Sequence, residues 1–157
     1  MERAILKAET TVNVSLDEAR DWFLSLEEHP ERYAFETHAG FAFVRGNFGE
    51  VGARFNTREK FHGLRVTLHF ELTGVNETRF RFRLLRPAPP VWGAFLIQAQ
   101  TSHTINLCLE VGGINRLGET ILQLPLVHSA VRRQIQGEAD HLKASMETVY
   151  AEGTESD

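Results

Sequence analysis

The sequence has one cysteine and no long apolar run. Cys108 alone excludes an intramolecular disulfide and a zinc site built from several cysteines. No apolar stretch approaches the roughly 20 residues that a helix needs to span a bilayer. The N-terminus also becomes polar too early for a signal peptide. We therefore expect a cytoplasmic location and no integral membrane association.

Positive charge is scarce as well. The 157-residue chain has 17 basic and 21 acidic residues, and its formal net charge is −4. Phosphate groups attract a positive surface, so this balance argues against a nucleic-acid binder and a generic binder of anionic membranes. Arginine outnumbers lysine fourteen to three, but the arginines lie within strand patterns rather than in a basic block.

Tyrosine and tryptophan are rare, with two of each, whereas phenylalanine occurs eleven times. Phenylalanine supplies a large apolar area without a polar group to satisfy, which suits a core or the wall of an apolar pocket. A chain of this length can bury a sizeable core in one domain. We predict one domain over residues 1–152, followed by a flexible polar tail over 153–157.

The first part of the chain predicts a strand and two short helices. Residues 3–14 alternate loosely and contain β-branched residues, which is typical of a strand. Ser15 and Glu18 have the spacing of a capping box, so a helix should begin there. Pro30 must interrupt this helix, because the residue before a proline avoids the helical region, and Pro30 can open a second short helix.

From about residue 35 to residue 111 the apolar residues recur with a period of two. Such alternation predicts a sheet with one buried and one wet face, which favours antiparallel pairing. From about Leu117 to Tyr150 the period becomes helical, and Pro125 should begin this helix or kink it. The expected strands cover residues 41–44, 54–61, 65–72, 79–84, 91–97 and 102–111.

A row of three arginines along one expected strand is a candidate phosphate-binding site: Arg79, Arg81 and Arg83. They alternate with apolar residues, however, and therefore share the solvent face of one strand. In a hairpin with the strand over 65–72, Glu71 would lie opposite them. We favour a solvated cross-strand charge ladder over a phosphate site.

Two inward-facing polar residues are weak candidates for catalysis. Glu59 has the strand parity of Phe55, and a carboxylate enclosed there could act as a general acid or base. The alternative is that Glu59 reaches water at the strand end or pairs with an arginine. His103 has the parity of Ile105 and could bind a polar ligand head or pair with Glu59, or it could be a structural histidine. Neither residue belongs to a complete catalytic motif.

No metal site or cofactor is expected. Glu138 and His141 have the helical Glu-x-x-His spacing of di-iron helix bundles, but the chain has only one such pair and too few helices for the other ligands. His62 and His69 have opposite strand parity and therefore cannot form a ligand pair.

The order of these elements and three segments resemble the START/Bet v 1-like superfamily, in its polyketide cyclase/dehydrase-like branch. The segments are residues 11–23 with 29–33, the glycine turn before the arginine-studded strands, and residues 138–143 with the apolar stripe that follows. The resemblance implies an α+β helix-grip fold. In this fold a curved antiparallel sheet of about seven strands surrounds a long C-terminal helix. The subfamily stays unassigned.

The resemblance also implies a cavity for a small hydrophobic molecule, lipid-like or polyketide-like, which the protein binds or carries. Two alternatives stay open: a polyketide cyclase/aromatase-like enzyme that uses Glu59 or His103, and a protein-partner module such as a chaperone or a respiratory-chain accessory. Phenylalanine side chains could also fill the space completely. The oligomeric state is not predicted. The expected ligand-binding residues are Phe55, Thr57, Glu59, Phe61, Leu68, Phe70, Phe82, His103, Ile105, Leu124, Val127, His128 and Val131.

Overall fold

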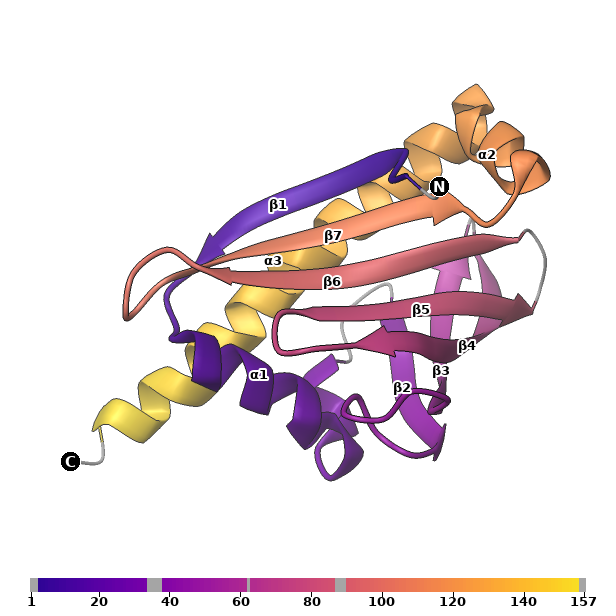
Figure 1. Ribbon diagram of the computed structural model, residues 1–157. Helices are drawn as coiled ribbons and strands as arrows, with labels where there is room; N and C mark the ends of the chain where they lie inside the picture. Colours follow the sequence, from indigo (N-terminus) through magenta and orange to yellow (C-terminus); the bar gives the residue numbers. More distant parts are fainter. Residues whose placement is uncertain (1–2, 34–37, 62, 87–89, 156–157) are drawn as a thin grey trace.

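Seven strands and three α-helices form the described part of the chain, which covers residues 3–33, 38–61, 63–86 and 90–155 of a computed structural model (Figure 1). The first strand, the short helices, the six further strands and the long last helix follow one another in the predicted order. The elements are β1 (Leu6–Val12), α1 (Leu16–Leu24), the 3-10 helices η1 (Ser25–Glu27) and η2 (Pro30–Tyr33), β2 (His38–Arg45), β3 (Arg54–Phe61), β4 (Leu64–Val75), β5 (Arg79–Arg86), β6 (Val91–Ala99), β7 (Ile105–Gly113), α2 (Arg116–Gln123) and α3 (Pro125–Glu155).

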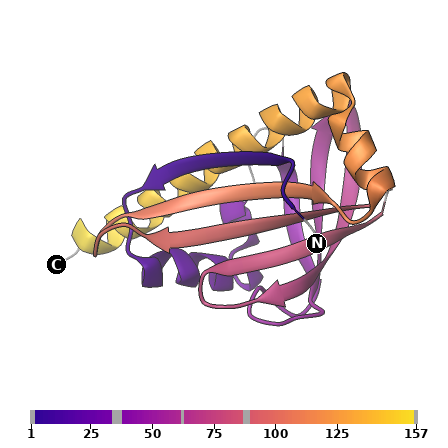
Figure 2. The ribbon, with the colours of Figure 1, turned by 45° about the horizontal axis from the view of Figure 1, so that its top comes forward.

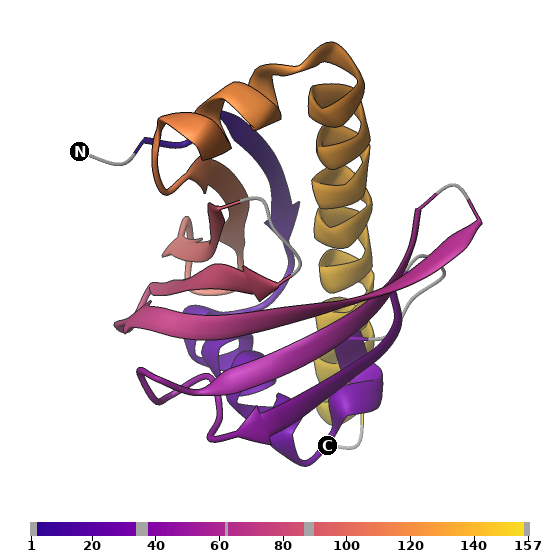
Figure 3. The ribbon, with the colours of Figure 1, turned by 90° about the vertical axis from the view of Figure 1, so that its right-hand side faces the viewer.

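All seven strands belong to one antiparallel sheet with the order β1-β7-β6-β5-β4-β3-β2. Strands β2 to β7 form a continuous meander, and β1 is added beside β7. The sheet is strongly curved, and α3 runs along its concave side (Figures 2 and 3). This arrangement confirms the predicted α+β fold, in which a curved sheet grips a long C-terminal helix.

The predicted hairpin with its charge ladder forms between β4 and β5. Glu71 lies opposite Arg83, and the neighbouring pair is Leu72 and Phe82. On the outer face the Glu71 carboxylate accepts hydrogen bonds from Arg83 at 3.0 Å and from Arg54 at 3.2 Å. Arg83 thus takes part in a surface ion-pair network with Glu71 and Arg54, while Arg81 of the same strand lies over the Trp92 ring, 4.8 Å from its centroid.

Helix α1 begins with the predicted capping box. The Ser15 hydroxyl accepts a hydrogen bond from the Glu18 backbone N–H at 3.1 Å, and the Glu18 carboxylate accepts one from the Ser15 N–H at 2.9 Å. Two backbone donors that would otherwise lack a partner are therefore satisfied. This cap fixes the point at which the chain leaves β1 and turns into α1.

Replacing Ser15 with alanine should lower the free energy of unfolding by about 0.5–2 kcal/mol, because the Glu18 N–H loses its acceptor. Urea denaturation of the two proteins would measure the difference. Ser129→Ala, on an exposed face of α3, is the matched control and should change stability by less than about 0.5 kcal/mol. Equal effects of the two substitutions would show that the cap contributes nothing.

The C-terminal helical segment is divided at Leu124. This residue has an extended backbone (φ −62°, ψ 130°), and Pro125 then begins α3. Proline suits the first position of a helix, because a backbone N–H there would have no partner within the helix. α3 continues to Glu155. The division between a domain ending at residue 152 and a flexible tail stays a prediction.

The core has two parts. Along α3, Ile135, Leu142 and Met146 are buried against the sheet. Beneath α1, aromatic rings fill the space between that helix and the sheet. The Phe23 ring lies 4.7 Å from Phe80 and 5.1 Å from Phe95, centroid to centroid. This end of the molecule is solidly packed.

Within the described ranges, none of the helices has the length and apolar content of a bilayer-spanning segment. Nor do the described residues bring three or more potential metal ligands together.

Candidate functional site

A cavity of about 340 Å³ lies between the concave side of the sheet and the N-terminal half of α3. Strands β3 to β7 form one wall, α3 forms the opposite wall, and α2 contributes Leu122. The volume lies at the lower end of the range typical of small-molecule pockets. The lining residues are Tyr33, Phe55, Thr57, Glu59, Val66, Leu68, Phe70, Phe82, Leu84, Val91, Trp92, Gly93, Val111, Leu122, Val127, Val131, Gln134, Ile135 and Glu138.

Three phenylalanines form the aromatic part of the wall. Phe55 and Phe70 are stacked, with ring centroids 5.2 Å apart and an angle of 21° between the planes. Phe82 meets Phe55 at 5.7 Å and Phe70 at 5.2 Å, edge to face in both cases. These geometries are the favourable ones for aromatic pairs, so the three rings hold one another in place. They present a rigid, flat surface to the cavity.

Polar side chains gather at one end of the cavity. Glu59 on β3 is only 3% exposed, and its carboxylate accepts a hydrogen bond from the Gln134 amide of α3 at 3.0 Å. Gln134 thereby ties the helix to the sheet across the cavity. The bond also orients the Glu59 carboxyl group and gives one of its buried oxygens a hydrogen-bond partner.

Tyr33 of η2 extends this polar end. Burial raises the pKa of the Tyr33 hydroxyl well above its usual value, and the nearby carboxylates of Glu138 and Glu59 raise this pKa further. The hydroxyl therefore keeps its proton at neutral pH and donates a hydrogen bond to Glu138. A phenol, an amide and two carboxylates from three different elements thus meet at the same place.

The Thr57 hydroxyl, also in the cavity wall on β3, has no hydrogen-bond partner among the described residues. Thr57 is 2% exposed and lies two residues before Glu59, on the same face of β3. A hydroxyl that is buried without a partner costs free energy, so polar groups in this situation commonly bind a water molecule or a ligand.

Many of the residues predicted from strand parity and helical spacing lie in the wall of this cavity. Their contact with a ligand stays a prediction. They are Phe55, Thr57, Glu59, Leu68, Phe70, Phe82, Val127 and Val131.

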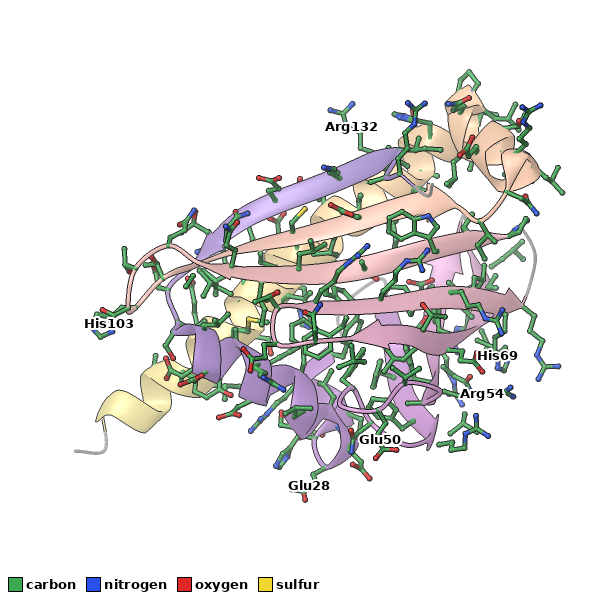
Figure 4. The ribbon with its side chains drawn as sticks, viewed as in Figure 1. Glu28, Glu50, Arg54, His69, His103 and Arg132 are labelled. Carbon is green, nitrogen blue, oxygen red and sulfur yellow. The ribbon has the colours of Figure 1, made fainter. Side chains whose placement is uncertain are left out.

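The expectation that His103 points inward is wrong. The turn between β6 and β7 is longer than the alternation suggests, because Gln100 and Thr101 both donate backbone hydrogen bonds to the Thr104 carbonyl. His103 lies in this turn, exposed, at the end of the sheet away from the cavity (Figure 4). The alternation of inward and outward side chains begins only at Ile105, where β7 starts. His103 therefore does not face the cavity and cannot pair with Glu59.

Three further predicted residues lie outside the cavity wall. Ile105 does point inward, but it is fully buried in the core near Val12, its partner in β1. Leu124 is about half exposed at the break between α2 and α3, where the extended backbone turns it outward. His128 is half-buried on α3 and does not line the cavity. Phe61 ends β3, and its side chain lies outside the described residues.

Sequence patterns could have found several lining residues that we did not predict. Gln134 and Glu138 follow Val131 at helical spacing and so share its face of α3. Val66 and Leu84 have the same strand parity as Leu68 and Phe82, which were predicted. For Tyr33 no pattern was available, because η2 is too short to show a period.

Comparison with solved structures places this fold among known ones. No family model and no curated protein matches the sequence. The aromatase/cyclase ZhuI from Streptomyces sp. R1128 superposes with a TM-score of 0.69 at 13% identity, covering 94% of each chain. Ara h 8.0201 gives a TM-score of 0.65 at 13% identity, covering 91% of this chain and 97% of that protein.

The di-domain aromatase/cyclase BexL from the BE-7585A biosynthetic pathway gives a TM-score of 0.68 at 16% identity. The match covers 96% of this chain and 47% of BexL, so the chain spans about half the length of that protein. Identities this low establish the fold alone. The chain has the same helix-grip α+β fold as these proteins, which is the fold that its sequence resemblance implies.

Proposed function

We propose that this protein binds or carries a small hydrophobic molecule in the cavity between the sheet and α3. The observation that supports the proposal most is the cavity of about 340 Å³ itself, with an aromatic and aliphatic wall and polar groups at one end only. The aromatic residues beneath α1 fill the opposite end of the sheet and leave this volume empty. A few well-placed polar groups in an apolar pocket are typical of sites for small molecules.

The distribution of polar groups suggests how such a molecule would lie. Its apolar body would pack against the rings of Phe55, Phe70 and Phe82, where a flat or aromatic molecule gains the largest contact area. A hydroxyl or carbonyl group would point towards Thr57 and Glu59. The Thr57 hydroxyl would then gain the hydrogen bond that it lacks within the described residues.

The folded protein should bind an uncharged fluorescent hydrophobic dye such as N-phenyl-1-naphthylamine, with a dissociation constant of about micromolar order. The apolar wall takes the dye out of water, which increases its fluorescence. Val131→Trp should abolish the signal by filling the cavity, whereas Leu124→Trp is the matched control because Leu124 lies outside the wall. Equal dye binding by all three proteins would contradict the proposed site.

Catalysis on the bound molecule is the second candidate function, and the buried Glu59 carboxylate is the observation that favours it. Held by Gln134, Glu59 could act as a general base on an enclosed substrate. Two of the similar structures are aromatase/cyclases. Glu59→Gln should abolish such an activity but leave the binding of the apolar dye nearly unchanged, which separates the two candidates.

A further inference from the structure

Large aliphatic side chains are exposed together where α2 meets α3. Leu126 is 87% exposed, Leu117 is 61% exposed and Leu124 is 49% exposed, and Ile114 just before α2 is also exposed. We call these four residues the corner patch. They lie at one extremity of the molecule, where α2 crosses from the sheet to the first turn of α3 (Figures 1 and 3). Exposed apolar residues that gather in this way mark an interaction site.

The orientation of α2 is fixed by its packing. Leu117 is exposed on α2 and Leu124 is exposed directly after its last residue, while Gly118 and Leu122 are buried on the face of α2 that packs inward. Gly118 approaches the chain before β6 so closely that an added Cβ would lie 2.0 Å from the Pro90 carbonyl oxygen. The helix therefore cannot rotate to bury Leu117. The exposure of the corner patch thus follows from how α2 packs.

Positive charge surrounds the corner patch. Arg116, Arg132 and Arg133 are all exposed, and Arg132 points outward from α3 (Figure 4). The sequence from Ile114 to Gly137, which contains the corner patch, has three arginines and one acidic residue, Glu119. The whole chain has a net charge of −4. The negative total thus conceals a basic region, and it does not by itself argue against an anionic partner for this region.

The corner patch is continuous with the cavity. Leu122 and Val127 line the cavity, while their neighbours Leu124 and Leu126 face outward. The same short segment therefore has one side in the cavity wall and the other side in water. The starts of β4 and β6 and the end of β5 lie at this end of the sheet. Two further exposed arginines are found there, Arg65 at the start of β4 and Arg86 at the end of β5.

We propose that the corner patch docks on the surface of an anionic lipid bilayer. The leucines enter the interfacial region, and Arg116, Arg132 and Arg133 lie among the lipid phosphates. Exposed large apolar side chains with arginines beside them are typical of segments that lie in the interface of an anionic membrane. A protein partner fits less well, because protein interfaces are enriched in aromatic residues and the corner patch has none.

Docking in this orientation would bring the α2 end of the cavity to the bilayer. A hydrophobic ligand could then pass between membrane and cavity without exposing its apolar surface to water. The docking itself needs no ligand, so it can be tested apart from the proposed binding function.

Sedimentation with lipid vesicles tests the proposal on the full chain. The protein should bind vesicles of phosphatidylcholine mixed with phosphatidylglycerol, and it should bind phosphatidylcholine alone more weakly. Raising the salt concentration should weaken the binding, because salt screens the arginines. The triple variant Leu117→Ser, Leu124→Ser and Leu126→Ser should bind at least about tenfold more weakly. Arg132→Gln with Arg133→Gln should remove most of the preference for anionic vesicles.

Val44→Ser with Val51→Ser is the matched control, because both valines are about as exposed as Leu117 but lie outside the corner patch. This variant should bind vesicles like the unaltered protein. In a second measurement, the fluorescence of Leu126→Trp should shift to shorter wavelength when anionic vesicles are added. The proposal is overturned if the unaltered protein binds neither kind of vesicle, or if the leucine variant binds anionic vesicles as well as the control variant does. It is equally overturned if the leucines instead mediate a concentration-dependent dimer without vesicle binding.

Discussion

Replacing Phe23 with alanine should lower the free energy of unfolding by about 3–5 kcal/mol, the usual cost of removing a buried aromatic ring. Phe23 is fully buried at the centre of the aromatic core beneath α1. Its ring contacts four others, those of Trp22, Phe48, Phe80 and Phe95, at centroid distances of 4.7–5.6 Å. These rings belong to α1, β5, β6 and the segment after β2, so no single element can move to fill the space.

Thermal and urea denaturation would measure this loss. Phe23→Leu is the graded control, since it keeps part of the volume and should cost clearly less than alanine. The far-UV circular dichroism spectrum should stay native in both variants at low temperature. A loss below about 1 kcal/mol for Phe23→Ala would mean that the aromatic core can collapse around the missing ring, contrary to its tight packing.

Replacing Leu142 with alanine should lower the free energy of unfolding by about 2–5 kcal/mol. Leu142 is fully buried on the face of α3 that packs against the sheet, between Ala139 and Met146, which are also fully buried. The backbone of a long helix cannot move inward at one residue, so the substitution should leave a void.

The same substitution elsewhere on α3 provides the control. Leu126→Ala removes the same atoms from a side chain that is almost fully exposed, and it should change stability by less than about 0.5 kcal/mol. Denaturation curves of the two variants, with unchanged slopes, would compare them directly. Similar losses at both positions would contradict the assignment of the buried face of α3.

The strands could be predicted from the sequence because one face of the sheet is apolar and the other is charged. In β5, for example, Phe80 and Phe82 alternate with three arginines, and a shift of one residue would exchange the two faces. The Ser15 cap and the Pro125 helix start were equally predictable, because each depends on a few adjacent residues. These local signals determine most of the element order.

The candidate site was only partly predictable, because its polar end is assembled from distant segments. Parity placed Thr57 and Glu59 inward, but nothing in the sequence indicates that η2 brings Tyr33 to them. His103 was placed wrongly because alternation continued by chance through a turn, where side-chain direction depends on the turn hydrogen bonds. Leu124 was placed wrongly because helical spacing does not reveal that the helix is broken before Pro125.

The position of β1 also has a consequence for the order of folding during synthesis. Among the seven strands of this sheet, β1 leaves the ribosome first, yet it pairs with β7, the last of them to be made. The residues around its end are held by α3, which is made later still: Lys143 donates to the Thr11 carbonyl, and the Asn13 N–H donates to Glu147, both at 2.9 Å. The meander from β2 to β7 can form step by step as it emerges, since each strand pairs with the one before it. Of the seven strands, the first to be synthesised is thus the last to find its neighbours, and β1 completes the sheet only when β7 and α3 are available.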